Sequence, residues 1–169
     1  MKAEIRQEDL NSPKLSWLCI EPMLVSVRGQ SMDAKRKVYL RLNEGQQALY
    51  LFYSFHNHTK SLTEFYWFSA YNIIDLRSWS GIRKGMKLFD LNEMVDVLDN
   101  IEALITDAKK SGETWHEVSP TDLEHNPQLL QKTGLLYATY QQEAQEAIIT
   151  MNEWVRQHQD LVLEVKAEA

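Results

Sequence analysis

An apolar stripe with helical spacing is the feature that most constrains what this chain can fold into. Between positions 90 and 108, apolar residues recur at intervals of three and four, which places them on one face of a helix. They are Leu91, Met94, Val95, Leu98, Ile101 and Ile105. Asp90, with Glu93 three residues later, predicts a capping box at the start of this helix, and Gly112 predicts its end.

Similar stripes and capping residues predict further helices along the chain. In the longest of them, glutamine and glutamate fill the face opposite the apolar stripe. Asn43 and Ser61 are each expected to cap a helix in the aromatic middle of the chain. The expected ranges are about 135–158 for the longest helix, 44–55 and 62–76 for the capped pair, 33–42 and 78–88 for two short helices, and a start at Ser12-Pro13 for the first.

These elements predict an all-α fold, namely a single compact, bundle-like domain of about six helices that spans residues 1–169. No two stretches have matching strand patterns, so no sheet is expected. Residues 1–10 are expected to form a terminus that can fray, and residues 112–127 a loop. A length of 169 residues with 44% apolar residues allows a sizeable core.

The single cysteine and the absence of long apolar runs bear on location. Cys19 cannot form an internal disulfide, and its apolar surroundings favour a buried thiol over a reactive one. No apolar run approaches the about 20 residues that a membrane span needs. The N-terminus lacks the continuous apolar segment of a signal peptide. A cytoplasmic location is therefore the default expectation, and a homodimer stays open.

Charge is distributed unevenly between the two halves of the chain. Residues 1–88 hold 13 Lys and Arg against 8 Asp and Glu, a balance of +5, whereas residues 89–169 hold 5 against 16, a balance of −11. The two sum to the net charge of −6. An acidic surface of this kind repels nucleic acid and attracts basic partners. The alternative is that the acidity only keeps the protein soluble, or that the basic half covers part of it.

The main functional prediction concerns the polar side of the 90–108 helix. Carboxylates spaced along a helix can imitate a row of DNA phosphates. This face is therefore predicted to bind a basic protein partner, such as a DNA-binding regulator or a toxin. The residues of this predicted partner-binding face are Glu93, Asp96, Asp99, Glu102 and Asp107.

Two other classes of function stay open. Four basic residues follow the aromatic middle of the chain, which is a pattern of direct nucleic-acid-binding modules. They are Arg77, Arg83, Lys84 and Lys87. The net charge of −6 argues against this class, because proteins that bind the nucleic-acid backbone generally have basic domains. An enzyme without a recognisable motif is the third class.

The aromatic middle of the chain has a simpler explanation as core. Ten of the 17 aromatic residues fall between Tyr50 and Trp79. Five of them sit at helical spacings in two adjoining predicted helices, which favours burial over stacking with bases. These five are Phe52, Phe55, Phe65, Phe68 and Tyr71.

No catalytic residue, metal or cofactor is predicted. His56 and His58 lie two positions apart, a spacing that lets two histidines share one ion in an extended segment. A zinc site needs a third ligand and usually a fourth. The other histidines lack supporting cysteines or ligand spacing, so an exposed polar turn explains the pair. The chain also lacks a Gly-rich phosphate loop and the nucleophile elbow of hydrolases.

Residues 42–50 carry a resemblance to a known family. Their sequence, LNEGQQALY, resembles the L-T-P-G-Q-R-A-L-Y helix opening of a bacterial, all-helical family of unknown function that includes small acidic DNA-mimic proteins. The order of helices is also similar, so that the resemblance covers residues 38–163. The chain departs from the family at residues 60–67, which keep only the aromatic part of an Asn-Gly-Gly-Phe-x-Gln-like pattern.

The resemblance implies an all-α acidic protein. In at least one member of that family, the acidic surface occupies the DNA-binding face of a transcription factor. The same kind of partner is therefore an expectation for this chain.

Overall fold

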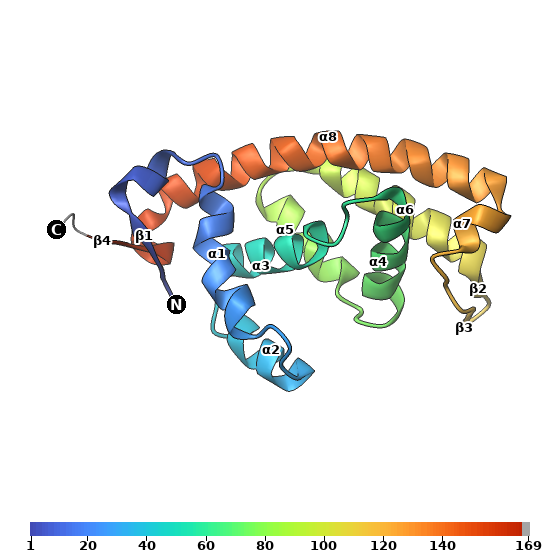
Figure 1. Ribbon diagram of the computed structural model, residues 1–169, viewed down its shortest axis with the longest axis horizontal. Coiled ribbons are helices and arrows are strands. Elements are labelled where there is room, and N and C mark those ends of the chain that lie inside the picture. The colour runs from blue at the N-terminus through green and yellow to red at the C-terminus, as the bar shows by residue number, and fades with distance from the viewer. Residues whose placement is uncertain (167–169) are drawn as a thin grey trace.

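The computed structural model describes residues 1–166, most of which are helical (Figure 1). The elements in this range are β1 (Ala3–Arg6), the 3-10 helix η1 (Gln7–Asn11), α1 (Leu15–Ser26), α2 (Met32–Tyr39), α3 (Glu44–His56), α4 (Leu62–Ile74), α5 (Trp79–Leu88), α6 (Asn92–Lys109), β2 (Lys110–Ser111), β3 (Thr114–Trp115), α7 (Asp122–His125), α8 (Pro127–Gln157), α9 (Gln159–Val162) and β4 (Leu163–Lys166). The predicted helical content is confirmed. The expected number of about six helices is too low, because the fold contains further elements, among them the single-turn helices α7 and α9.

α8 runs along the long axis of the molecule (Figure 1). Its 31 residues correspond to about 46 Å of helix, and α1, α4 and α6 pack against it. The helix begins at Pro127 and not near 135, because Asn126 Oδ1 accepts a hydrogen bond from Leu129 N at 3.0 Å. Pro127 fits the first helical position, where no N–H is needed. The expected loop at 112–127 therefore contains β3, α7 and the start of α8 instead.

Across residues 1–166, no helix combines the length and the apolar character that crossing a membrane requires.

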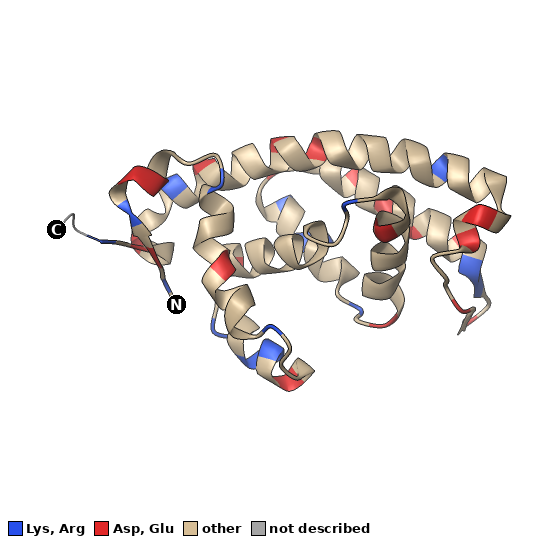
Figure 2. Ribbon diagram, in the orientation of Figure 1, with Lys and Arg blue, Asp and Glu red and all other residues tan. Residues whose placement is uncertain are grey.

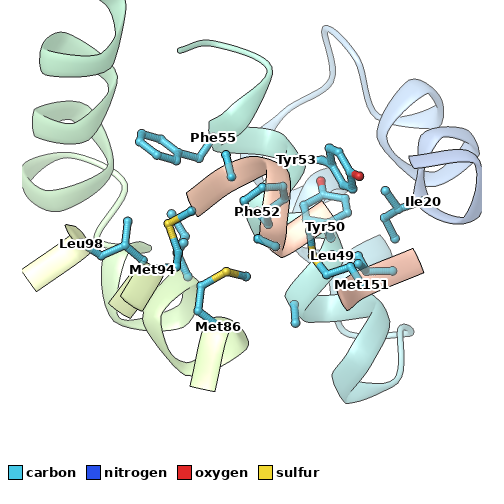
Figure 3. Packing of buried hydrophobic residues seen from close by; sticks show 14 of the residues in the cluster. Ile20, Leu49, Tyr50, Phe52, Tyr53, Phe55, Met86, Met94, Leu98 and Met151 are labelled. Atoms are coloured by element: carbon cyan, nitrogen blue, oxygen red, sulfur yellow. The ribbon is translucent and has the colours of Figure 1, made fainter. Parts of the chain in front are cut away.

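Buried side chains from α1, α3, α5, α6 and α8 form one hydrophobic cluster (Figure 3). In Figure 3, Phe52 of α3 lies near the centre, with Met94 and Leu98 of α6 on one side of it and Ile20 of α1 on the other. The predicted stripe of α6 is buried from position 94 onward. The prediction that Cys19 is buried is also confirmed, and burial raises the pKa of its thiol to about 12, which keeps it unreactive.

The caps predicted for α3 and α4 are confirmed. Asn43 Oδ1 accepts a hydrogen bond from Gln46 N at 2.9 Å, and Ser61 Oγ accepts one from Glu64 N at 3.2 Å. Both bonds satisfy backbone donors that a helix start leaves unpaired. These local signals therefore fix the beginnings of two neighbouring helices.

The cap predicted for α6 at Asp90 is wrong. Asp90 has a φ of +56°, and Leu91 takes the position before the helix. The reason lies in the preceding helix, because Asp90 N donates to Lys87 O at 3.1 Å and Leu91 N donates to Met86 O at 3.0 Å. These two bonds form a Schellman motif that ends α5. Asp90 thus closes one helix and does not open the next.

Two small sheets correct the prediction that no sheet forms. β1 and β4 pair in parallel, with Ala3 opposite Leu163 and Ile5 opposite Val165. Ala3 and Ile5 are buried, so within residues 1–10, expected to fray, the part from Ala3 onward forms β1 and η1 and packs on the core. β2 and β3 form a hairpin whose turn contains Gly112 at a φ of +58°, in the left-handed region that glycine favours.

Candidate functional site

α6 presents three of the five predicted acidic residues on the side that faces away from the core. Leu98 and Ile101 are buried against the rest of the protein, whereas Glu93, Asp96 and Asp107 are exposed. Figure 2 shows acidic segments on α6 and α8 and basic segments on α2 and α5. The exposed carboxylates of α6 are distributed over about 21 Å of helix, given a rise of 1.5 Å per residue. We call Glu93, Asp96 and Asp107 the α6 acidic face.

The structure separates Asp99 from this face. Arg83 of α5 makes a two-point ion pair with Asp99, through its Nε and through Nη2, which donates to Asp99 Oδ2 at 3.0 Å. The two side chains are 30% and 44% exposed, so the pair is partly shielded from water. Asp99 and Arg83 belong to two different predicted sites, and here they neutralise each other. Glu102 is half-buried, on the flank of the helix.

The α6 acidic face carries uncompensated charge. No ion pair within residues 1–166 involves Glu93, Asp96, Glu102 or Asp107. Glu93 lies in the first turn of α6, where the helix dipole favours a negative charge. The face therefore consists of exposed carboxylates on one helix that have no ion-pair partner among residues 1–166.

The four residues predicted as a nucleic-acid-binding site have different surroundings. Lys84 and Lys87 are exposed on α5, but Arg83 is committed to Asp99. Arg77 precedes the helix, is exposed, and has a φ of +52°. Only two of the four predicted cations thus share one helix without an acidic partner in the described part of the chain.

The two histidines considered as a metal pair have different surroundings. His56 Nδ1 lies 2.9 Å from the Tyr140 hydroxyl, and its ring stacks on Phe52 with centroids 5.1 Å apart. His58 instead stacks on Phe68 at 4.5 Å. No group of three or more His, Cys, Asp or Glu side chains that could hold a metal ion occurs among the residues described.

His56 is a partly buried residue at the end of α3 whose ring packs between other side chains. Its burial, and after it the charge of Lys60, lowers the pKa of His56 to about 4. The ring is therefore neutral at pH 7, which suits its place between Phe52 and Tyr140. The prediction of an exposed polar turn is wrong for this residue.

The aromatic middle of the chain divides between core and surface. Phe52, Phe55 and Phe65 are buried, as predicted. Phe68 and Tyr71, expected in the core, are only partly buried, because they lie toward the outer side of α4. This outer side borders a cleft.

The cleft lies between α4 and the segment from β3 to Val118, and its volume is about 280 Å³. Trp67 and Tyr71 of α4 line it with stacked rings whose centroids are 5.6 Å apart. Trp115 of β3 contributes a third ring, and Asp75 and Glu117 contribute two exposed carboxylates. We call this site the α4–hairpin cleft.

A largely buried ion pair holds the wall of the α4–hairpin cleft in place. Lys109 Nζ lies 2.7 Å from Asp122 Oδ2 and also donates to Glu117 O at 2.9 Å. Tyr66 OH and Ser119 N donate to Asp122 Oδ2 at 2.8 and 3.0 Å. Burial alone would raise the pKa of Asp122, but these hydrogen bonds hold it below its ordinary value. The 115–122 segment is therefore tied to α4 and α6.

Sequence reasoning did not find this cleft. Trp115 lies in a segment expected to be a loop, and no local pattern indicates that it approaches α4. The i, i+4 spacing of Trp67 and Tyr71 was a usable signal, because it places both rings on one side of a helix. Which side faces solvent depends on how α4 packs on α6 and α8, and that is a property of the whole fold.

No family model, curated protein or solved structure matches the chain. The resemblance to the family of acidic DNA mimics therefore stays a prediction. Within the segment that carries it, three residues have structural roles. Asn43 caps α3, Gly45 lies against the ring of Trp154, and Gln46 is buried and donates to Met1 O at 2.7 Å.

Proposed function

We propose that the protein is a non-catalytic interaction protein whose α6 acidic face binds a basic protein partner. One observation carries the proposal. Glu93, Asp96 and Asp107 are exposed on a helix whose opposite side is packed in the core, and none of them makes an ion pair with another described residue. The three carboxylates are therefore charged, and the packed helix fixes the positions of their Cα atoms relative to one another.

Its dimensions suit a partner that binds nucleic acid. Glu93 and Asp96 are separated by a rise of about 4.5 Å along the helix, which is of the same order as the roughly 3.4 Å of axial rise per phosphate on one DNA strand. Asp107 lies about 16.5 Å further along the helix. A basic surface built for phosphates can contact such a row. A DNA-binding regulator is thus the favoured partner, and a basic toxin is a second possibility of the same class.

The direct nucleic-acid-binding class is less well supported. Arg83, which that class needs, is neutralised by Asp99, and the chain as a whole carries a net charge of −6. Long-range repulsion would then oppose the approach of a polyanion. A mobility-shift assay with mixed-sequence DNA at low salt is expected to show no complex. A complex that weakens steeply with salt would favour this class instead.

The test of the proposal compares two variants with equal charge changes. The first is Glu93→Gln, Asp96→Asn and Asp107→Asn on the α6 acidic face. The matched control is Asp33→Asn, Glu44→Gln and Glu164→Gln, three exposed carboxylates on α2, α3 and β4. Asp99 is left unchanged, because its removal would strand Arg83 in a partly buried position.

Parent and both variants are immobilised and exposed to lysate, and retained proteins are identified and purified. The proposal expects a basic protein retained by the parent and the control but lost by the α6 variant. Retention that is equal for both variants would assign recognition to another surface and overturn the role of α6. Retention of no basic protein by the parent would contradict the proposal.

A further inference from the structure

We propose that the α4–hairpin cleft binds an organic ammonium group, with a trimethylammonium group as the best-fitting form. This inference is independent of the partner proposed for α6. It stands on three features of the cleft, namely its aromatic lining, the sign of the charge around it, and its size.

The aromatic lining provides three rings that can attract a cation. Trp67, Tyr71 and Trp115 all line the cleft, and ammonium groups are attracted to the π-face of such rings, most strongly to that of tryptophan. Trp115 already contacts one cation, because Lys110 Nζ lies 5.4 Å from its ring centroid. Lys110 is not among the residues that line the cleft, so its ammonium does not fill the space.

The charges around the cleft also favour a cation. Asp75 and Glu117 line it, and the last turn of α4 contributes Tyr71 and Ile74. The C-terminal end of a helix carries partial negative charge, and the last turn of α4 contains no basic residue to offset it. Among the described residues that line the cleft, His116 is the one titratable base, and its Nε2 lies 2.8 Å from Ser111 Oγ. Lys110 lies against Trp115 from outside the lining, and the charge of Lys109 is offset by Asp122, so the carboxylates of Asp75 and Glu117 set the sign of the charge in the lining itself.

The size and rigidity of the cleft point to a small ligand. A volume of about 280 Å³ is at the lower end of ligand cavities, which suits an ammonium headgroup and not a nucleotide. Lys109 and Asp122 hold the hairpin side of the cleft, as described above, so little ordering is needed on binding. A preformed aromatic and acidic cleft of this size fits a compact organic cation.

The experiment uses the full chain labelled with 5-fluorotryptophan. The five tryptophans give five fluorine resonances, and Trp67→Phe and Trp115→Phe assign the two in the cleft. Choline is titrated to roughly 20 mM, which covers the millimolar affinities of small ligands. The neutral control is 3,3-dimethylbutan-1-ol, which has the shape of choline without its charge. The three resonances that neither substitution removes, those of Trp17, Trp79 and Trp154, serve as the internal control.

The expected result is a saturable shift of the Trp67 and Trp115 resonances with choline and an affinity at least about tenfold weaker for the neutral alcohol. A peptide with trimethyllysine and the same peptide with unmodified lysine then distinguish a protein-borne ammonium from a free one. Saturable binding of choline or of either peptide supports the proposal. No shift with any of the three, or equal affinity for the neutral alcohol, would overturn it.

Substitutions test whether the carboxylates that line the cleft contribute to binding while the fold stays intact. Asp75→Asn with Glu117→Gln is expected to weaken binding by about tenfold, because two compensating charges are lost. Glu113→Gln removes an exposed carboxylate of the same hairpin that does not line the cleft, and it is expected to leave the affinity unchanged. Equal effects of these two changes would contradict the role given to Asp75 and Glu117. Unchanged resonances of the three tryptophans outside the cleft show that each variant is folded.

Discussion

α3 and α6 both contribute to the hydrophobic core, but they differ in how much of their surface is buried. α3 is buried on several sides, and even its polar residue Gln46 is enclosed. α6 is buried along one stripe, and its other side carries exposed carboxylates. The identities of residues in α3 are therefore set by packing, whereas those on the outer side of α6 are not needed for the fold. Substitutions should divide in the same way, into effects on stability and effects on association.

The largest effect is expected on the inner side of α6. Leu98 is 1% exposed, and Leu98→Ala should lower the free energy of unfolding by about 2–5 kcal/mol through lost burial and a cavity. Asn100→Ala, on the exposed side of the same helix, should change it by less than about 0.5 kcal/mol. Urea denaturation measures both. Equal effects would show that the two sides of α6 are wrongly assigned.

The stripe of the longest helix also predicts a core position at Ile148. This residue is only partly buried in α8, so Ile148→Ala should cost less than Leu98→Ala.

The second effect concerns His56 at the end of α3, and it depends on pH. The pKa of His56 is about 4 in the folded protein against an ordinary value of 6.5, so the unfolded chain binds a proton first as the pH falls. Stability from the neutral ring is complete above pH 6.5 and is lost between pH 6.5 and about 4. The loss amounts to at most about 3 kcal/mol. The pKa of Asp122 is lowered from its ordinary value of 3.8. The stability that this carboxylate contributes is therefore lost only at pH values more acidic than the range in which His56 acts.

Denaturation curves at a series of pH values measure this loss. His56→Gln should remove most of the slope between pH 6.5 and about 4. His125→Gln, a change at an exposed histidine, should leave it in place. A slope that is unaffected by His56→Gln would mean that another group causes it.

The third effect tests the close approach of α3 to α8. A Cβ on Gly45 would overlap the ring of Trp154, so Gly45→Ala should destabilise the protein by about 1–3 kcal/mol. Gly134 lies inside α8, and a methyl group added there would meet no atom within 4 Å, so Gly134→Ala should stabilise the protein by about 0.5–1 kcal/mol. Thermal unfolding measures both. A stabilising Gly45→Ala would contradict the packing of α3 on α8.

These contrasts also show what the sequence alone can predict. Caps and stripes are local, so Asn43, Ser61 and the buried side of α6 were predictable from neighbours in the chain. Asp90 also has a local signal, but two helices compete for it, and the end of α5 uses it. The outcome of such a competition depends on how Phe89, which is buried, docks in the core.

Long-range arrangements were not predictable in this way. β1 and β4 pair across almost the whole chain, and each strand has only four residues. The Arg83–Asp99 pair joins two segments that sequence reasoning treated as separate sites. The α4–hairpin cleft likewise depends on Asp122 reaching Lys109 and Tyr66. Each of these contacts is created by the packing of elements, and no local sequence pattern predicts it.

The smallest effect on stability is expected on the outer side of α6. The variant Glu93→Gln, Asp96→Asn and Asp107→Asn should change the free energy of unfolding by less than about 1 kcal/mol, because exposed charges contribute little. Its effect should appear in binding instead. Denaturation of this variant beside the Asp33, Glu44 and Glu164 control checks the first part. A loss comparable to that of Leu98→Ala would show that the outer side of α6 is needed for the fold.

The most direct test of the account is the association rate of the purified basic partner across a salt series. With the parent protein, this rate should fall as salt rises, and at low salt the α6 variant should associate about three- to tenfold more slowly. The control with three carboxylates removed elsewhere should behave like the parent. Equal rates for the parent and the α6 variant, with no dependence on salt, would contradict a recognition role for the α6 acidic face.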